Sequence, residues 1–331
     1  MRVLAGDIGG TKTLLQITEC RAGRCRPVRE QRFDSGAYDS LSSIIREFLK
    51  KDENKSVKAV CFGIAGPVKQ TAKSESVKVT NLPWEIHGSD LRRKFGFPVL
   101  RLINDFQAVG YGIEALAKKD RVVLQKGRPV RHAPRAVLGA GTGLGQGILM
   151  WDKDHYAPVA TEGGHANFAP TDELQLDLAQ RLLKTHGRTS WELVLSGHGL
   201  VDLYAFMKAR GELPESPAVA RAMQDDDPAA IIARAALDQN DPLANRTLDL
   251  FVDIYGAQAG NLALTAGATG GVYIAGGIAP KIISRLTDGR FMRAFLSKGR
   301  MKSYVEAIPV QVVTNPQVGL IGAALAATRL K

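Results

Sequence analysis

The stretch RVLAGDIGGTKTLLQIT, residues 2–18, opens the chain, and RAVLGAGTGLGQGILM, residues 135–150, repeats its plan. In each stretch a short apolar run leads into a glycine-rich turn and a second apolar run follows, a pattern typical of two strands joined by a hairpin turn. Each turn combines glycine with threonine, as Gly9-Gly10-Thr11 and as Gly141-Thr142-Gly143. The repeat indicates a duplicated strand–turn–strand unit.

Turns of this composition are suited to binding phosphate. Glycine lets the backbone approach an anion closely and adopt positive φ, so that successive N–H groups converge on it, and a threonine hydroxyl adds a donor. Asp7 lies in the first turn, where a carboxylate beside phosphates makes sense as a partner of Mg²⁺, directly or through water. Either turn alone is equally well explained as a tight hairpin. Together they predict a clamp that holds a triphosphate from both sides.

Two other phosphate-binding patterns are excluded by the sequence. The Walker pattern needs a Gly-Lys dipeptide, and the chain contains none. A dinucleotide fingerprint needs Gly-x-Gly-x-x-Gly followed by a helix, but the run Gly139 to Gly145 is out of register and strand-like residues 147–149 follow it. These absences favour an actin-like arrangement of two phosphate turns.

The rest of the chain alternates between strand and helix patterns. Strands are expected at residues 57–64, 99–103, 272–274 and 310–313, and helices at 40–49, 105–116, 173–183, 191–210, 243–264 and after Gly319. The fold class is therefore α/β. At 331 residues the chain exceeds the usual size of one hydrophobic core. We expect a small domain of residues 1–115 plus 311–331 and a large domain of residues 116–310, packed face to face with a cleft between them.

Composition narrows the class of protein further. Apolar residues make up 45% and charged residues 23% of the chain, as in soluble globular proteins. There is no run of the ~20 apolar residues that a membrane helix needs, and the N-terminus lacks a signal-peptide pattern. We therefore expect a cytoplasmic protein with no membrane partner.

The three cysteines, Cys20, Cys25 and Cys61, are odd in number and lack the spacing of a zinc site or a disulfide framework. Cys20 and Cys25 could face each other across a hairpin, but reduced thiols are the prediction. They are assigned no function.

The net charge of +11 favours an anionic partner. ATP meets that requirement. The densest basic stretch, residues 118–135, lacks the interleaved aromatic side chains that stack on bases, so it is expected to be a solvated loop followed by a strand. Nucleic acid is not expected to bind.

Longer motifs make a family resemblance specific. GDIGGTKT, GAGTGLGQG and GGVYIAGGIAPK resemble the two phosphate motifs and the adenosine motif of the hexokinase, heat-shock chaperone and actin superfamily. Within it, LINDFQAVGYGI, EGGHANFAP and LVLSGHGLVDLY resemble bacterial glucokinases over nearly the whole chain. The resemblance implies two actin-like, ribonuclease H-like domains with an active-site cleft between them. It assigns ATP binding to residues of the three motifs: Gly6, Asp7, Gly9, Gly10, Thr11, Gly141, Thr142, Gly143, Gly276 and Gly277.

The same resemblance implies an ATP- and Mg²⁺-dependent glucokinase that phosphorylates the sugar 6-hydroxyl, with Asp105 as the general base. Asn104-Asp105 also follows a predicted strand, the usual place for ligand-binding residues in an open α/β sheet, although both residue types are good helix N-caps. A base is needed because the hydroxyl must lose its proton during transfer. The full set of sugar-binding residues implied is Asn81, Asn104, Asp105, Glu162, His165 and Glu192.

The sugar-side residues have plausible chemistry of their own. In Glu162-Gly-Gly-His165 the glycines allow close approach, a carboxylate can accept two hydroxyl bonds and a neutral imidazole can donate or accept. A metal pair is the alternative, but no cysteine lies nearby. Glu192 alone would be an ordinary acid in the first turn of a helix, and Trp84, beside Asn81, is expected to pack rather than bind.

Two rival functions remain. A hexose or amino-sugar kinase of the ROK type resembles the chain at the glycine turns, but such proteins normally carry a cysteine-rich zinc loop, and residues 167–200 contain no cysteine. A non-enzymatic actin-like repressor would need a helix-turn-helix, and no room precedes the turn that begins at Gly6. The family also suggests a homodimer whose domains close around the sugar to exclude water.

Overall fold

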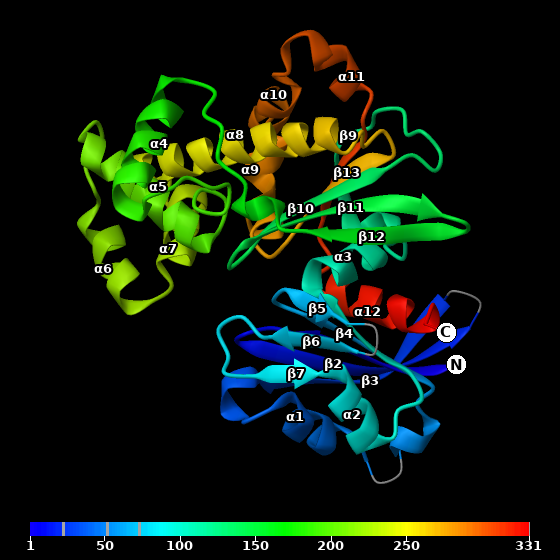
Figure 1. Ribbon diagram of the computed structural model, residues 1–331. Coiled ribbons are helices and arrows are strands. Elements are labelled where there is room, and N and C mark those ends of the chain that lie inside the picture. Colours follow the sequence, from blue (N-terminus) through cyan, green and yellow to red (C-terminus); the bar gives the residue numbers. More distant parts are fainter. Residues whose placement is uncertain (22–23, 51–52, 72–73, 331) are drawn as a thin grey trace. The chain divides into compact units, whose positions relative to one another are not determined.

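The computed structural model describes residues 1–330 except 22–23, 51–52 and 72–73. The chain divides into two compact units (Figure 1). Unit 1 comprises Met1–Lys119, Asp152–Ala160 and Asn315–Lys331, and unit 2 comprises Asp120–Trp151 and Thr161–Thr314. The domains predicted from the sequence, with boundaries at residues 115 and 311, stay a prediction. Among the described residues there is no helix long and apolar enough to cross a membrane.

Unit 1 is built on a five-stranded mixed sheet. The strand order is β3-β2-β1-β4-β8, with β1, β2 and β3 antiparallel neighbours and β1, β4 and β8 parallel neighbours. The first turn of the sequence therefore joins β1 to β2, as expected. The strands are β1 (Arg2–Ile8), β2 (Lys12–Arg21), β3 (Arg24–Asp34), β4 (Ala59–Ile64) and β8 (Leu100–Asn104).

Alternation along the strands of unit 1 supplies two apolar faces. In β1, Leu4 and Ile8 belong to one buried cluster, which includes helix α1 (Leu41–Phe48), whereas Val3 and Ala5 belong to another, which includes α12 (Val318–Thr328). This follows from the two-residue period of a strand. Helices α2 (Gly88–Phe95) and α3 (Asp105–Ile113), the three short strands β5 (Val68–Gln70), β6 (Glu75–Lys78) and β7 (Glu85–His87), and 3₁₀ turns at Ser35–Ala37, Glu53–Ser56 and Lys118–Asp120 complete the described part of the unit.

Helices α3 and α12 of unit 1 approach each other unusually closely. A Cβ placed on Gly322 would lie within van der Waals overlap of the Ala108 carbonyl oxygen, and one on Gly112 would overlap that of Val318. Only glycine permits this backbone contact. The start of α3, where Asp105 lies, is thereby fixed against the C-terminal helix.

Unit 2 repeats the strand order of unit 1. The six-stranded sheet runs β12-β11-β10-β13-β14-β9, so the first hairpin, β10 and β11, is again followed outward by parallel strands β13 and β14. Its strand β12 falls, except for Thr161, in the segment Asp152–Ala160 of unit 1. The edge strand β9 is antiparallel to β14 and has no counterpart in the other sheet. The strands are β9 (Arg121–Gln125), β10 (Arg135–Ala140), β11 (Leu144–Asp152), β12 (His155–Thr161), β13 (Gly271–Ala275) and β14 (Val310–Val313).

The helices of unit 2 pack around α8, which is the long yellow helix of Figure 1. Its Tyr255 is fully buried, accepts a hydrogen bond from the Ala140 N–H and donates one to the Ala275 carbonyl, so α8 joins the ends of β10 and β13. The helices are α4 (Glu173–His186), α5 (Gly197–Arg210), α6 (Pro217–Asp225), α7 (Pro228–Leu237), α8 (Pro242–Thr265), α9 (Ile283–Thr287), α10 (Arg290–Leu296) and α11 (Lys302–Glu306), with 3₁₀ turns at Gly163–His165, Ala279–Ile282 and Gly299–Met301.

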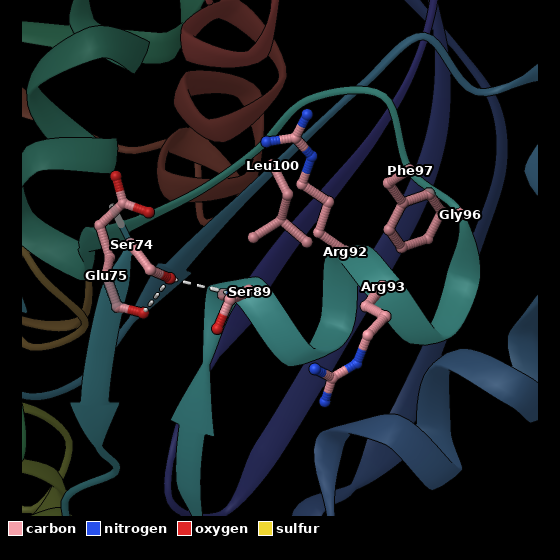
Figure 2. Close-up of a pocket in the computed structure, with 9 residues that line it drawn as sticks. Ser74, Glu75, Ser89, Arg92, Arg93, Gly96, Phe97 and Leu100 are labelled. Carbon is pink, nitrogen blue, oxygen red and sulfur yellow. Dashed lines mark hydrogen bonds between the residues drawn. The ribbon is translucent and has the colours of Figure 1, made fainter. Parts of the chain in front are cut away.

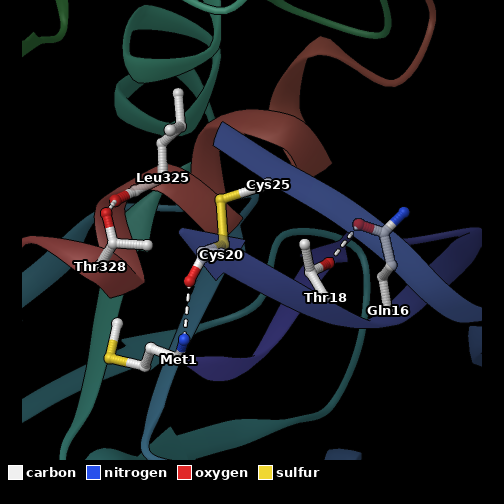
Figure 3. The surroundings of a disulfide bond; sticks show 7 residues. All are labelled: Met1, Gln16, Thr18, Cys20, Cys25, Leu325 and Thr328. Atoms are coloured by element: carbon white, nitrogen blue, oxygen red, sulfur yellow. Dashed lines mark hydrogen bonds between the residues drawn. A yellow bond between two sulfur atoms is a disulfide. The ribbon is translucent and has the colours of Figure 1, made fainter. Parts of the chain in front are cut away.

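The prediction of reduced cysteines is wrong for two of the three. Cys20 and Cys25 are joined in a disulfide (Figure 3). Cys61 is a buried free thiol whose pKa is raised by burial. The two bonded residues are direct register partners in β2 and β3, with Cα atoms 4.1 Å apart, so the hairpin itself brings their sulfur atoms together. Sequence spacing suggested the hairpin but not the bond.

Two other expectations needed correction. The helix predicted over residues 191–210 begins only at Gly197, because residues 191–196 form a turn that ends with Ser196 as the N-cap. The basic stretch 118–135 is less open than a solvated loop, since it contributes a 3₁₀ turn, Lys118–Asp120, and the edge strand β9 before β10 begins.

Candidate active site

The first glycine turn, between β1 and β2, is held in shape by Ser35. The Ser35 hydroxyl donates to the Gly9 carbonyl (2.9 Å) and its N–H donates to the Thr11 carbonyl (3.1 Å). The Gly9 N–H is itself donated to the Lys12 carbonyl at 2.9 Å. These bonds do not use the N–H groups at the tip of the turn, those of Gly10 and Thr11.

Gly10 brings Asn81 to the first turn. A Cβ on Gly10 would lie 2.9 Å from the Thr80 carbonyl oxygen and 3.2 Å from the Cβ of Asn81. Asn81 is exposed and has a left-handed backbone (φ 63°). Trp84, as predicted, is a packing residue: it is buried, and its indole N–H donates to the Tyr38 carbonyl at 3.1 Å.

Gly6 has a different reason to be glycine. It lies inside β1 rather than in the turn and is buried, and a Cβ there would lie 2.6 Å from the Phe62 ring. Packing of β1 against Phe62 thus accounts for this residue without a ligand.

Asp7, at the end of β1, has the electrostatics expected of a cation partner. Burial raises its pKa, and the nearby Lys12 ammonium opposes that shift. The carboxylate therefore lacks the full compensation that a buried charge requires. Gly319, in the first turn of α12, lies beside it, with its Cβ position 3.7 Å from a carboxylate oxygen. One carboxylate in this setting fits Mg²⁺, which commonly takes one or two carboxylates and completes its shell with water and phosphate.

Asn104 and Asp105 lie where β8 ends and α3 begins. Asn104 is the N-cap: its side-chain oxygen accepts from the Phe106 N–H (2.9 Å), and Gln107 accepts from the Asn104 N–H (3.1 Å), which completes a capping box. Asp105 is the first helical residue, and its carboxylate also accepts from the Phe106 N–H (2.9 Å). The Asp105 carboxylate therefore shares the Phe106 N–H with the Asn104 cap at the start of α3.

The second glycine turn, between β10 and β11 in unit 2, closes on itself. The Gly141 N–H donates to the Gly143 carbonyl, and the Gly141 carbonyl accepts from the Gly197 N–H, both at 2.8 Å. Thr142, at the tip, is exposed. The N-terminus of α5 is thereby tied to the turn.

Gly276 and Gly277 meet the second turn after β13. Gly276 has φ +81°, and a Cβ on it would lie 2.4 Å from the Ala140 carbonyl oxygen, which also accepts from the Ile278 N–H at 3.1 Å. The second glycine turn and the Gly276-Gly277 turn are therefore neighbours within unit 2.

The expected role of positive φ in these motifs is wrong at most positions. Among the glycines predicted to bind ATP, only Gly276 has a positive φ. At Gly6, Gly10 and Gly143 the missing side chain instead permits close contacts, whereas a Cβ on Gly141 or Gly277 would meet no atom of the described structure within 4 Å.

His165 lies between two carboxylates of unit 2. Its Nε2 is 3.9 Å from Glu162 Oε2 and its Nδ1 is 3.7 Å from Glu192 Oε1. The side chains are open to solvent to different degrees: 68% for Glu162, 53% for His165 and 34% for Glu192. Three polar side chains that converge and remain accessible form a surface suited to sugar hydroxyls.

Backbone contacts hold this cluster in place. The Glu192 N–H donates to the Gly164 carbonyl (2.9 Å), and the Arg188 guanidinium donates to the His165 carbonyl (2.7 Å). Glu192 precedes α5 by several residues, so the alternative that it is merely a first-turn acid of that helix is excluded. Within the described part of the chain, no group of three or more His, Cys, Asp or Glu side chains is arranged to hold a metal.

One residue near this cluster was missed by the sequence analysis. Gln146 of β11 is buried, its amide oxygen lies 2.8 Å from where a Gly163 Cβ would be, and its amide nitrogen has no partner among the described atoms. A glutamine at an inward-facing position of an otherwise apolar strand is the signal that could have identified it.

A separate hollow of about 470 Å³ on unit 1 contains none of the predicted site residues (Figure 2). At the N-terminus of α2, on its edge, the Ser89 N–H donates to the Ser74 hydroxyl (2.9 Å). Its lining residues are Ser74, Glu75, Gly88, Ser89, Arg92, Arg93, Gly96, Phe97 and Leu100.

Comparison with known proteins settles the family. The family model described as Glucokinase matches residues 4–330. The chain belongs to the glucokinase family. A glucokinase of Nostoc punctiforme is 45% identical, with 99% of each chain covered, and one of Synechocystis sp. is 42% identical, with 98% of each covered. The predicted family is confirmed, and the chain is an enzyme.

Solved structures agree with this membership. The glucokinase of an Antarctic psychrotroph superposes with a TM-score of 0.84 at 33% identity over 99% of both chains. A ROK-family glucokinase of Streptomyces griseus, solved with glucose and AMPPNP, has a TM-score of 0.66 at 21% identity, covering 99% of this chain and all of its own, and so shares the fold alone. The predicted actin-like α/β fold class is confirmed.

Proposed function

We propose that the protein transfers the terminal phosphoryl group of MgATP to the 6-hydroxyl of glucose, with Asp105 accepting the hydroxyl proton. The observation that carries the mechanism is the placement of Asp105 at the carboxyl end of parallel strand β8, beside a separate helix cap. This is the edge of an open α/β sheet at which ligands bind. Membership of the glucokinase family supports the reaction and the substrate.

The nucleotide side of the proposal uses residues of both sheets. The backbone N–H groups at the two turn tips would bind phosphate oxygens, and Gly276-Gly277 would lie against the adenosine. Asp7 would hold Mg²⁺, which when bound neutralises charge on the phosphate oxygens during transfer. The raised pKa of Asp7 supports this, because a buried carboxylate gains most from an added cation.

The chemical step then has a simple balance. The 6-oxygen forms a bond to the terminal phosphorus, its proton passes to a carboxylate oxygen of Asp105, and the bond from that phosphorus to the bridging oxygen breaks to release ADP. Asn104 and Asn81 would orient hydroxyls of the sugar. Glu162, His165 and Glu192 would bind its remaining hydroxyls.

The protein is further proposed to act as a cytoplasmic homodimer that does not bind nucleic acid. The family resemblance supports the dimer, and the absence of aromatic side chains from the basic stretch 118–135 supports the last point. Light scattering at micromolar protein concentration measures the oligomeric state directly, and a mass near twice 35.7 kDa is expected for the dimer. A monomer would refute the dimer without affecting the proposed reaction.

The choice of sugar is tested by coupled ADP release with glucose, fructose, mannose, N-acetylglucosamine and N-acetylmannosamine. Glucose is expected to have the highest kcat/KM, because a site built to bind particular hydroxyls leaves its polar groups unpaired with the wrong sugar. A clear preference for another sugar would replace glucose with a different hexose or an amino sugar as the substrate.

A further inference from the structure

The two oxygens of Glu192 face two different parts of unit 2. Oε2 accepts a hydrogen bond from the Leu144 N–H at 3.0 Å, and Leu144 ends the second glycine turn. Oε1 lies 3.7 Å from His165 Nδ1 in the sugar cluster. One carboxylate thus touches the phosphate turn and the sugar-side turn at once.

Gly143 makes this position of the carboxylate possible. A Cβ on Gly143 would lie 2.5 Å from Glu192 Oε2 and 3.3 Å from its carboxyl carbon. Gly143 does not have a positive φ, so its backbone conformation is open to other residues. The close approach of Glu192 is therefore the reason that this position is glycine.

Gly141, two residues away in the same turn, provides the contrast. A Cβ on Gly141 would have no atom of the described structure within 4 Å, and its φ is not positive either. What an added methyl group would meet therefore differs between the two glycines: the Glu192 carboxylate at Gly143 and open space at Gly141. The same substitution at the two positions consequently isolates the contact with Glu192.

The backbone around Glu192 repeats the link. Its N–H donates to the Gly164 carbonyl at 2.9 Å, and its carbonyl accepts from the Ser196 hydroxyl at 2.8 Å. The N–H of Gly197, the residue after Ser196, donates to the Gly141 carbonyl at 2.8 Å. The segment from Glu192 to Gly197 therefore spans from the sugar-side turn to the phosphate turn.

We propose that Glu192 is a positioning residue that couples the two substrates: through one carboxylate, the geometry of the second phosphate turn and that of the sugar cluster depend on each other. The inference rests on the proposed function, since it takes the two turns as the sugar and nucleotide sites. Sugar hydroxyls bound at Oε1 fix the carboxylate, which fixes the Leu144 N–H and the turn before it. The effect is reciprocal, because coupling between two bound ligands must be equal in both directions.

Glucose binding without nucleotide, measured by titration calorimetry, gives the first test. Gly143→Ala pushes the Glu192 carboxylate away from the turn and is expected to weaken glucose binding about tenfold, within the usual range of coupled sites. Gly141→Ala adds the same methyl group in open space, so glucose affinity is expected to stay at the wild-type value. Equal glucose affinities for the two variants would overturn the inference.

A second variant guards against misfolding of the first. Glu192→Asp keeps the charge but is one methylene shorter, so it cannot reach Leu144 and His165 together. For the wild type, saturating glucose is expected to tighten binding of AMPPNP roughly fivefold or more. In Glu192→Asp the ratio of AMPPNP affinities with and without glucose is expected to fall to about one, whatever the absolute affinities. If Glu192 only contacted the sugar, the substitution would leave this ratio unchanged.

Failure of the inference and failure of the proposed function give different results. If the wild-type protein binds neither glucose nor AMPPNP, the proposed function is wrong. If the wild type binds both ligands but Glu192→Asp keeps the wild-type ratio, the function stands and the coupling through Glu192 is refuted.

Discussion

The charge of the Asp7 carboxylate is only partly compensated in the free protein. Its pKa is raised above the ordinary aspartate value because burial outweighs the attraction of Lys12. The free energy of unfolding is therefore undiminished by Asp7 below the pKa that this carboxyl has in the unfolded chain. It decreases as the pH rises from there through the raised pKa of the folded protein. The ionised carboxylate therefore destabilises the metal-free fold relative to a neutral side chain at this position.

Asp7→Asn is accordingly expected to raise the melting temperature of the metal-free protein at pH 7, and to raise it less as the pH falls toward 4. It should also raise the Mg²⁺ concentration needed for half-maximal turnover. Differential scanning calorimetry across pH and a Mg²⁺ titration of kcat measure the two effects. A lower melting temperature at pH 7 would show that the carboxylate is well compensated after all.

At this scale the sequence predicted chemistry better than geometry. The motif order located the residues that form the Glu162, His165 and Glu192 cluster, because their order in the chain is enough to recognise them. It did not reveal that Glu192 lies against Gly143, since that contact joins residues of two separate turns. The prediction that these glycines adopt positive φ was also wrong at most positions. Backbone conformation and contacts between distant segments cannot be read from the order of residues alone.

Among the elements, the pair α3 and α12 sets the position of the proposed base. Gly322→Ala would place a methyl group on the Ala108 carbonyl oxygen, and helix separation is the only relief. We expect a loss of about 3 kcal/mol in the free energy of unfolding, from overpacking, together with a lower kcat because α3 begins at Asp105. Urea denaturation and steady-state kinetics measure both.

Gly36→Ala is the matched control for that substitution. Its Cβ would lie 3.6 Å from the Asp34 carboxylate, an ordinary contact, and its φ is not positive. Stability and kcat close to the wild-type values are expected for this variant. If Gly322→Ala behaves like Gly36→Ala, the tight contact between α3 and α12 is not real.

The hairpin of β2 and β3 gives a further prediction at this scale. The Cys20–Cys25 bond lies at the C-terminal half of α12, beside Leu325 and Thr328, and the N-terminal amine of Met1 donates to the Cys20 carbonyl at 2.6 Å (Figure 3). The bond closes only a short loop, so replacing both cysteines by serine is expected to cost about 2 kcal/mol of stability. Activity should not change, because neither residue lies among those assigned to substrates.

Urea denaturation of the Cys20→Ser, Cys25→Ser double variant, beside the wild type with and without dithiothreitol, measures this effect. The reduced wild type should resemble the double variant. Identical unfolding midpoints for the oxidised wild type and the variant would mean that the disulfide does not contribute to the stability of the protein.

Elements were predictable where a single period dominates. α1 was recognisable because its buried residues recur every three to four positions, and the β1–β2 and β10–β11 hairpins because glycine turns separate their apolar runs. β3 was not, since most of its described side chains are exposed and charged on an outer strand of the sheet. The true start of α5 was hidden because residues 191–196 are apolar enough to read as helix.

For the whole molecule, the repeated strand order is the main result. β1 in one sheet and β10 in the other lie inside the sheet, with the next two strands of the chain on one side and two parallel strands on the other. The sequence already suggested this duplication through its two glycine turns, but the extra edge strand β9 and the small sheet of β5, β6 and β7 were not predictable, because their runs are short. The turns open both units with the same device, as phosphate binding in an actin-like fold requires.

The central claim is that this enzyme phosphorylates glucose with Asp105 as the base. The most direct test is ADP release from MgATP with saturating glucose, comparing the wild type with Asp105→Ala, with folding of the variant checked by circular dichroism. General-base catalysis is typically worth 10²–10⁴-fold, so kcat is expected to fall by roughly that factor while glucose still binds. An Asp105→Ala variant that turns glucose over at the wild-type rate would contradict the mechanism.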